Sequence, residues 1–251
     1  RREATSSWRG EGALDVSAVE FMDSRSLDVV ADEAFARAGV ARPARGAGLL
    51  LVQIEITGGE DAALGQMDAV LHACGVHADP HVALPGDERG AARLFELREA
   101  VPASLNAMIA AAKLRVHPDI EKTAGDLIVP FERLEESLAL YRGTFERCGL
   151  EYALWGHVSD GNMHPNVVPR SLEDVHRGRA AILDIARHVV AMGGAPLAEH
   201  GVGRSALKQR LLLELYGKRG IDEMRAVKRA LDPDWKCSSG VLFPEIPSPK
   251  S

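Results

Sequence analysis

The chain has 251 residues, of which 46% are hydrophobic and 26% are charged, and its formal net charge at pH 7 is −6. These proportions are those of an ordinary globular protein that is large enough for one large domain or two small ones. The acidic balance argues against a nucleic-acid-binding surface, and no apolar run approaches the roughly 20 residues that a membrane-spanning helix needs.

The spacing of apolar residues predicts strands and helices that alternate along the first half of the chain. Strands are predicted at 13–23, 48–58 and 77–84, and helices at 26–39, 60–75 and 87–113. Gly39 and Gly75 are typical ends of the first two helices, because glycine readily adopts the left-handed conformation that closes a helix. Pro102 lies inside the third helix, where it should kink or restart the helix.

The second half continues the alternation, with strands predicted at 125–131, 150–158 and 162–169 and helices at 132–149, 171–194, 206–217 and 221–233. Ser171 is a suitable N-cap for the longest of these helices, and acidic residues follow it in the first turn. Together the elements indicate an α+β fold in which helices cover one side of a mainly antiparallel sheet. We expect one domain over residues 1–244 and a short tail over 245–251.

The stretch GHVSDGNMH, residues 156–164, places two histidines around an Asp-Gly pair between two apolar strands. If Asp160 and Gly161 form a two-residue hairpin turn, His157 lies opposite His164. Directly opposed side chains of an antiparallel pair have Cβ atoms about 5 Å apart, so both imidazoles could reach one metal ion. Asn166 lies two residues beyond His164 and therefore on the same face of its strand.

A third, anionic ligand is available in the glycine-rich stretch AEHGVGR, where Glu199 and His200 are adjacent. Two neutral histidines and one carboxylate leave positions open on a metal ion, as a catalytic site requires. Two histidines seven residues apart are more often incidental, and it is the nearby Glu-His pair that strengthens the case for a metal. The three cysteines are widely spaced, which argues against a cysteine-based zinc site and favours a reducing cytoplasm.

A resemblance to a known family rests on several motifs that occur in a fixed order: AVEFMDSRSL, LFELREAVPAS, GHVSDGNMHPNVV, AEHGVGR, and MRAVKRALDPDWK followed by GVLFP. In this order they resemble the C-terminal domain of FAD-linked 2-hydroxy acid oxidases and dehydrogenases, which include glycolate oxidase, D-lactate dehydrogenase and D-2-hydroxyglutarate dehydrogenase. The resemblance covers nearly the whole chain, and the combination is specific although each motif alone is weak. It implies a ferredoxin-like cap domain that covers a flavin and forms the substrate site.

The resemblance also implies roles for particular residues. Arg98 would clamp the carboxylate of a small 2-hydroxy acid, and Asn166 would hydrogen-bond the same substrate. His200 would remove the proton of the substrate hydroxyl as hydride leaves the α-carbon for the flavin. A divalent metal, commonly zinc, would be bound by His157, His164 and Glu199.

Two motifs depart from the family pattern. Some members have a substrate-binding lysine six residues before the proline of the DLxxP strand, and here that position is Ala124, which favours a small monocarboxylate of the glycolate or D-lactate type. Where the family has NPGK near the C-terminus, this chain has Ser238 and Ser239 in place of the Asn and Pro, so no flavin-contacting residue is identified.

The sequence holds neither a GxGxxG motif after a strand nor a P-loop, so it offers no recognisable cradle for the flavin phosphates. The family resemblance implies that FAD is bound mainly by an N-terminal domain, which is absent from these residues. On this interpretation the chain is part of a longer polypeptide, and a separate FAD-binding protein is the less favoured alternative. The isolated chain is expected to be inactive.

Two other functions fit the same motifs. One is a free-standing metal-dependent hydrolase, in which the site activates water and Asp160 or His200 acts as general base. The other is a non-catalytic domain that keeps a structural metal and binds a partner or a second copy of itself as a homodimer. For the favoured oxidoreductase we expect a cytoplasmic location, with peripheral attachment to the inner membrane left open.

Overall fold

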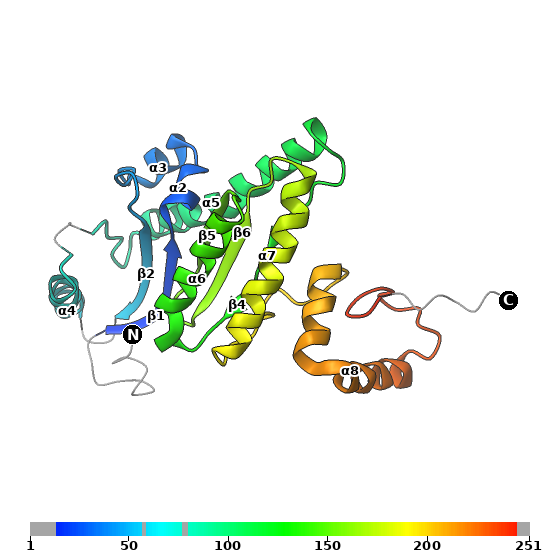
Figure 1. Ribbon diagram of the computed structural model, residues 1–251. Helices are drawn as coiled ribbons and strands as arrows, with labels where there is room; N and C mark the ends of the chain where they lie inside the picture. The colour runs from blue at the N-terminus through cyan, green and yellow to red at the C-terminus, as the bar shows by residue number, and fades with distance from the viewer. Residues whose placement is uncertain (1–13, 57–58, 77–79, 245–251) are drawn as a thin grey trace. The chain divides into compact units, whose positions relative to one another are not determined.

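The computed structural model describes residues 14–56, 59–76 and 80–244 (Figure 1), and the predicted tail at 245–251 lies outside them. The chain divides into two compact units. Unit 1 comprises the described residues up to Ala111 together with Ala153–Ser159, and unit 2 comprises Ala112–Tyr152 with the described residues from Asp160 onward. The two units are described separately below.

Unit 1 is built on three antiparallel strands in the order β2 (Leu49–Ile56), β1 (Leu14–Met22) and β5 (Tyr152–His157). Strands β1 and β2 lie side by side along their length (Figure 1), with an irregularity in register near Val16. Because β1 and β5 are antiparallel, Glu20 lies directly opposite His157. The helices of this unit are α2 (Ser24–Asp28), α3 (Asp32–Ala38), α4 (Glu60–Ala73) and the part of α5 (Glu88–Arg115) that ends at Ala111.

Unit 2 contains β6 (Asn162–Val167), which pairs antiparallel with the short strands β3 (Thr123–Ala124) and β4 (Leu127–Ile128). Both short strands keep one register on β6, so Asp126, which lies between them, falls opposite His164. A second segment lies along β4, where Asp126 bridges Leu197 and Ile128 bridges Ala195. These two bridges hold residues 195–197 beside the strands, and Glu199 and His200 follow directly after this segment.

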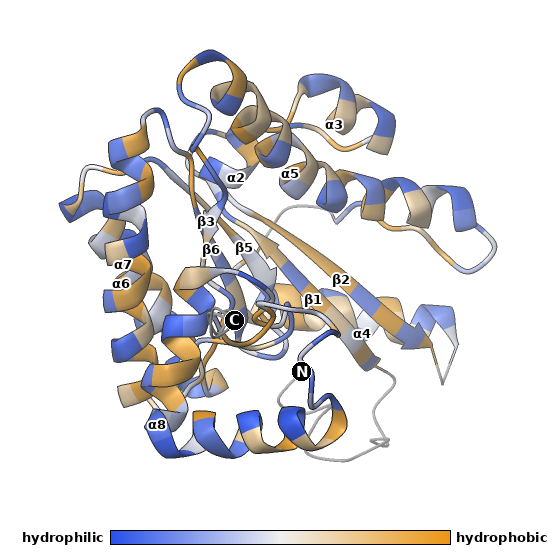
Figure 2. Cartoon of the chain, turned by 90° about the vertical axis from the view of Figure 1, so that its right-hand side faces the viewer, coloured by the Kyte–Doolittle hydropathy of each residue, from blue (hydrophilic) through white to orange (hydrophobic). Residues whose placement is uncertain are grey.

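The helices of unit 2 are the 3₁₀ turn η1 (Phe131–Arg133), α6 (Leu134–Arg147), α7 (Leu172–Ala191) and α8 (Ala206–Leu231). Helix α7 packs on β3, β4 and β6 and also contacts α6 and α8. Gly178 permits α7 to approach β6 closely, because a Cβ at this position would lie 3.0 Å from Val167 Cγ2 of the strand. Figure 2 shows hydrophilic and hydrophobic residues mixed along α5, α7 and α8, as expected for helices with one buried face. None of the described helices is long and apolar enough to cross a membrane.

The predicted α+β class with a mainly antiparallel sheet is confirmed, and most of the predicted elements form. Ser171 caps α7 as predicted, in a capping box completed by Asp174. The two helices predicted at 206–217 and 221–233 meet at Gly217, which has a non-helical backbone inside α8.

Several element predictions are wrong. The helix predicted at 26–39 is two short helices, because Ala31 has an extended backbone and starts α3. The strand predicted at 77–84 does not form over its described residues, 80–84, where prolines stand at positions 80 and 85. Helix α5 continues through Pro102, so of the two outcomes predicted there, a kink or a restart, the restart does not occur.

Candidate functional site

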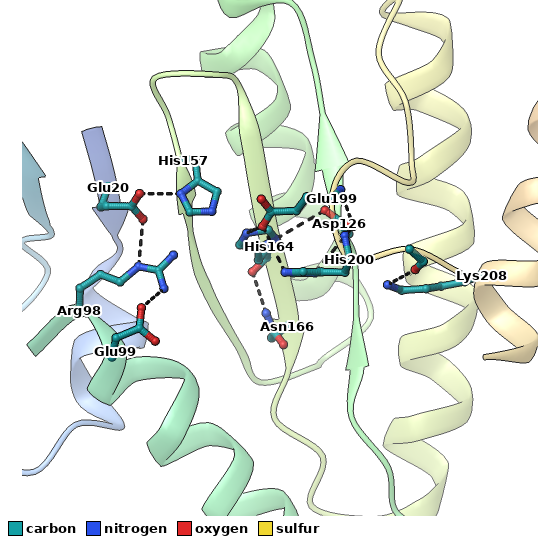
Figure 3. Close-up of polar contacts among 11 residues, drawn as sticks. Glu20, Arg98, Glu99, Asp126, His157, His164, Asn166, Glu199, His200 and Lys208 are labelled. Carbon is teal, nitrogen blue, oxygen red and sulfur yellow. Dashed lines mark hydrogen bonds and ion pairs between the residues drawn. The ribbon is translucent and has the colours of Figure 1, made fainter. Parts of the chain in front are cut away.

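The main polar cluster of unit 2 consists of Asp126, His164, Glu199 and His200 (Figure 3). Asp126 and His164 come from paired strands and are only 2% and 3% exposed. Glu199 and His200 belong to the loop that follows the bridge to β4, and both are exposed. The cluster therefore joins a buried strand pair to an open loop, which makes it accessible from one side.

The ligand atoms of this cluster converge. His164 Nε2 and His200 Nε2 each lie 3.1 Å from Glu199 Oε1. The two imidazole rings are stacked, with centroids 4.6 Å apart and an interplanar angle of 29°. One potential ligand atom from each of the four residues lies within 4.8 Å of the others.

Asp126 fixes the loop that carries the exposed pair. Its Oδ2 accepts the backbone N–H of Glu199 at 3.1 Å and that of His200 at 2.7 Å. Lys208 supports the same loop by donating from Nζ to the Gly201 carbonyl oxygen at 2.8 Å. Burial lowers the pKa of the Lys208 ammonium, and the charge of Asp126 acts in the opposite direction.

The chemistry of this cluster suits a divalent cation. Two imidazoles and two carboxylates are donors that zinc, iron and manganese all accept. Asp126 Oδ1 is buried and has no hydrogen-bond partner among the described residues, although a buried carboxylate oxygen normally has one. The convergence of donors, together with this oxygen, fits a bound metal ion.

Asn166 lies beside the cluster on β6, opposite Ala124 of β3. Its side-chain amide donates to the backbone oxygen of His164 at 2.8 Å, and its Oδ1 is buried without a hydrogen-bond partner in the described part of the chain. The Ala124 side chain that lies opposite it is small. The Asn166 side chain is thus fixed by one hydrogen bond, and its Oδ1 remains as a hydrogen-bond acceptor.

A second polar cluster lies in unit 1, where Glu20 of β1 holds two of the predicted site residues. Glu20 Oε2 accepts from Arg98 Nε at 2.9 Å, and Glu20 Oε1 lies 2.5 Å from His157 Nδ1. Arg98 also pairs through Nη1 with Glu99 at 2.5 Å. Burial raises the pKa of the Glu20 carboxyl, but the hydrogen bond to His157 and the charge of Arg98 outweigh this effect, and the pKa falls below its usual value.

The structure brings some of the sequence-predicted residues together. His164, Glu199 and His200 share the cluster of unit 2, with Asn166 next to His164. Arg98 and His157 belong to unit 1 and share Glu20.

The predicted two-residue turn is wrong, because β5 ends at His157, β6 begins at Asn162, and residues 158–161 form the turn between them. The strand register deduced from a two-residue turn therefore does not hold. The predicted ligand set of His157, His164 and Glu199 remains a prediction, and so do the roles of Arg98, Asn166 and His200.

Sequence reasoning missed the two carboxylates that organise these clusters, Asp126 and Glu20. A signal for both was present, because each is an acidic residue inside a short apolar strand, in GDLIVPF and AVEFM. A buried carboxylate is costly unless it is paired, so such positions mark polar clusters.

The fold and the clusters define a class, namely an α+β domain with a histidine–carboxylate centre. A family model, described as the C-terminal domain of FAD linked oxidases, matches residues 3–242. The chain belongs to this family.

Several curated proteins resemble the chain. Glycolate oxidase subunit GlcD of Bacillus subtilis is 27% identical over 227 residues, which cover 90% of this chain and 44% of the relative. A probable mitochondrial D-lactate dehydrogenase of Danio rerio is 32% identical over 149 residues, which cover 59% of this chain and 28% of the relative. D-2-hydroxyglutarate dehydrogenase of Escherichia coli is 32% identical over 127 residues, or 48% of this chain and 12% of the relative. The chain thus spans less than half the length of these relatives.

Proposed function

We propose that this chain is the substrate-binding and catalytic part of an FAD-dependent oxidoreductase that converts a small D-2-hydroxy acid, of the glycolate or D-lactate type, into the 2-oxo acid. The observation that carries the proposal is the cluster of Asp126, His164, Glu199 and His200, because it offers metal ligands and a histidine base in one place. Family membership and the named activities of the relatives support it. The region over residues 1–244 acts as the cap, and another domain binds most of the FAD.

Each residue has a role that follows from its chemistry. His164 and Glu199 bind the metal ion, and His157 is the third ligand that the resemblance to the family implies. Arg98 pairs with the substrate carboxylate, since a guanidinium has five N–H donors and Glu20 and Glu99 use only part of them. Asn166 accepts a hydrogen bond from the substrate through its buried Oδ1.

His200 takes the proton of the substrate hydroxyl at its Nε2. It is well placed for this task because it is exposed and yet fixed by the bond from its backbone N–H to Asp126. A divalent ion, when bound, lowers the pKa of the substrate hydroxyl and so eases this proton transfer. The flavin, when bound, accepts the hydride that leaves the α-carbon.

The metal part of this proposal is tested by titrating the chain with Zn²⁺ in a calorimeter. We expect about one equivalent to bind to the wild type and binding to be lost in His164→Ala and Glu199→Ala, since each variant removes a predicted ligand. His188→Ala is the matched control, because it removes an exposed imidazole of α7 that bonds to the Asp184 carbonyl oxygen. Equal binding by all four proteins would refute the site.

The catalytic part is tested after the chain is joined to an FAD-binding domain, by following dye reduction with glycolate or D-lactate. A general base contributes about 10²–10⁴-fold to rate, so His200→Gln should lower kcat by at least about 100-fold. The KM for the hydroxy acid should change less, because His200 acts on the proton and not on the carboxylate. An unchanged kcat would contradict the role of His200.

A further inference from the structure

Glu20 of β1 is shared between two of the sequence-predicted residues of unit 1 (Figure 3). Its Oε1 lies 2.5 Å from His157 Nδ1, and its Oε2 lies 2.9 Å from Arg98 Nε. Both separations are short enough for hydrogen bonds, and Glu20 is only 8% exposed. The strand register places Glu20 directly opposite His157, so the pairing of β1 with β5 holds the two side chains together. One buried carboxylate thus binds an imidazole and a guanidinium at the same time.

The short contact with Glu20 decides which nitrogen of the His157 ring carries the proton. A neutral imidazole has one N–H donor and one unprotonated nitrogen, and a carboxylate that is paired with a guanidinium is ionised and only accepts hydrogen bonds. The ring nitrogen that lies 2.5 Å from Glu20 is therefore the donor, because two acceptors do not approach so closely without a proton between them. In the neutral ring this leaves Nε2 unprotonated.

We propose that Glu20 is a positioning residue that holds the proton of His157 on Nδ1, so that the ring presents an unprotonated Nε2. The inference rests on the proposed function, in which His157 is a metal ligand, because a ligating imidazole must offer an unprotonated nitrogen. The same carboxylate fixes Arg98 through Nε, which leaves N–H groups on the Nη atoms for the substrate carboxylate. Glu20 thus orients a metal ligand and a substrate-binding group from one position.

Glu20→Gln separates this role from a purely structural one, because Arg98 dictates how the new amide is oriented. A guanidinium has donors and no acceptor, so the glutamine oxygen accepts from Arg98 Nε and the NH₂ group faces His157. The NH₂ group can only donate to the ring, which requires an unprotonated Nδ1 and moves the proton to Nε2. The variant therefore keeps the hydrogen bond to Arg98 and reverses the tautomer of His157.

The direct readout is the imidazole ¹⁵N spectrum of the metal-free full chain at about pH 9, well above the usual histidine pKa of about 6.5. The His157 resonances are those that disappear in His157→Gln. We expect protonated Nδ1 in the wild type and protonated Nε2 in Glu20→Gln. Glu99→Gln alters the other carboxylate on Arg98, which is 65% exposed, and is the control in which the wild-type tautomer should persist. The same tautomer in the wild type and Glu20→Gln would overturn the proposal, and so would a wild type with protonated Nε2.

Titration with Co²⁺, followed by its visible absorption, then separates this proposal from the proposed function. Glu20→Gln should bind Co²⁺ about 10–100-fold more weakly than the wild type while keeping its circular dichroism spectrum, because the loss of such a partner commonly changes metal affinity by this factor. Glu99→Gln should bind Co²⁺ as the wild type does. Equal affinity in Glu20→Gln would overturn the link between Glu20 and the metal. If the wild type bound no Co²⁺ but the tautomer reversed as expected, the role of Glu20 would stand and the metal part of the proposed function would fail.

Discussion

Replacing Glu20 with glutamine should lower the free energy of unfolding of unit 1 by about 2–3 kcal/mol, the worth of one hydrogen bond to a charged group. Glu20 is 8% exposed and is shared by Arg98 and His157. The side-chain oxygen of glutamine can accept a hydrogen bond from one of these two partners, but its NH₂ group then takes the place of the carboxylate oxygen that faces the other partner. The loss stays below the roughly 3–5 kcal/mol of a fully buried broken pair, because the side chains of Arg98 and His157 keep 15% and 24% exposure.

Glu99→Gln provides a matched control on the same guanidinium. Glu99 pairs with Arg98 at 2.5 Å, but its side chain is 65% exposed, and exposed pairs contribute only about 0–1 kcal/mol. Both variants are compared with the wild type by urea unfolding, followed by the fluorescence of the buried Trp155 in unit 1. If Glu20→Gln costs no more than Glu99→Gln, burial of the shared carboxylate does not organise this cluster and the reasoning fails.

Two further predictions concern unit 2. Burial raises the pKa of Asp174, but the hydrogen bonds from Arg177 and from backbone N–H groups outweigh this effect, so the folded pKa lies below the unfolded one. The ionised carboxylate therefore stabilises the fold above about pH 4, and this stabilisation is lost as the pH falls through the folded pKa. The difference in free energy of unfolding between the wild type and Asp174→Asn should be larger at about pH 5 than at about pH 2.5. Gly161→Ala should cost more than about 2 kcal/mol in a thermal melt, because φ is 76° and the new Cβ would lie 2.2 Å from the Val129 oxygen. Gly193→Ala, with φ of 84° but only a 3.8 Å contact, should cost about 1 kcal/mol, and equal losses would contradict the clash argument.

The sequence was sufficient for elements whose signals are local. Helix α7 illustrates this, since a Ser171 cap, acidic residues in the first turn and apolar residues at helical spacing all lie within one segment. Strand β2 is equally local, because it is a β-branched and apolar run bounded by glycines. His164, Glu199 and His200, which the structure places in one cluster, were also singled out from the sequence, since their motifs are short and glycine-rich.

The parts that sequence reasoning missed depend on pairing between distant segments. Asp126 reaches the cluster because β3 and β4 pair with β6, and because residues near 195–198 bridge to the same stretch. The Glu20 contact with His157 joins residues far apart in the chain. No periodicity in one segment specifies which carboxylate lies opposite which histidine, since strand register is set by the packed sheet as a whole.

The two clusters have the same arrangement of a histidine beside a buried carboxylate. This arrangement explains the two histidines of GHVSDGNMH better than a two-residue hairpin turn does. Each histidine of the stretch lies opposite a buried carboxylate on an antiparallel segment: His157 opposite Glu20 in unit 1, and His164 opposite Asp126 in unit 2. In both cases the carboxylate is on the Nδ1 side of the ring. A carboxylate on this side orients an imidazole. The acidic residues hidden in two apolar strands therefore explain how this sequence keeps two histidines oriented among apolar neighbours.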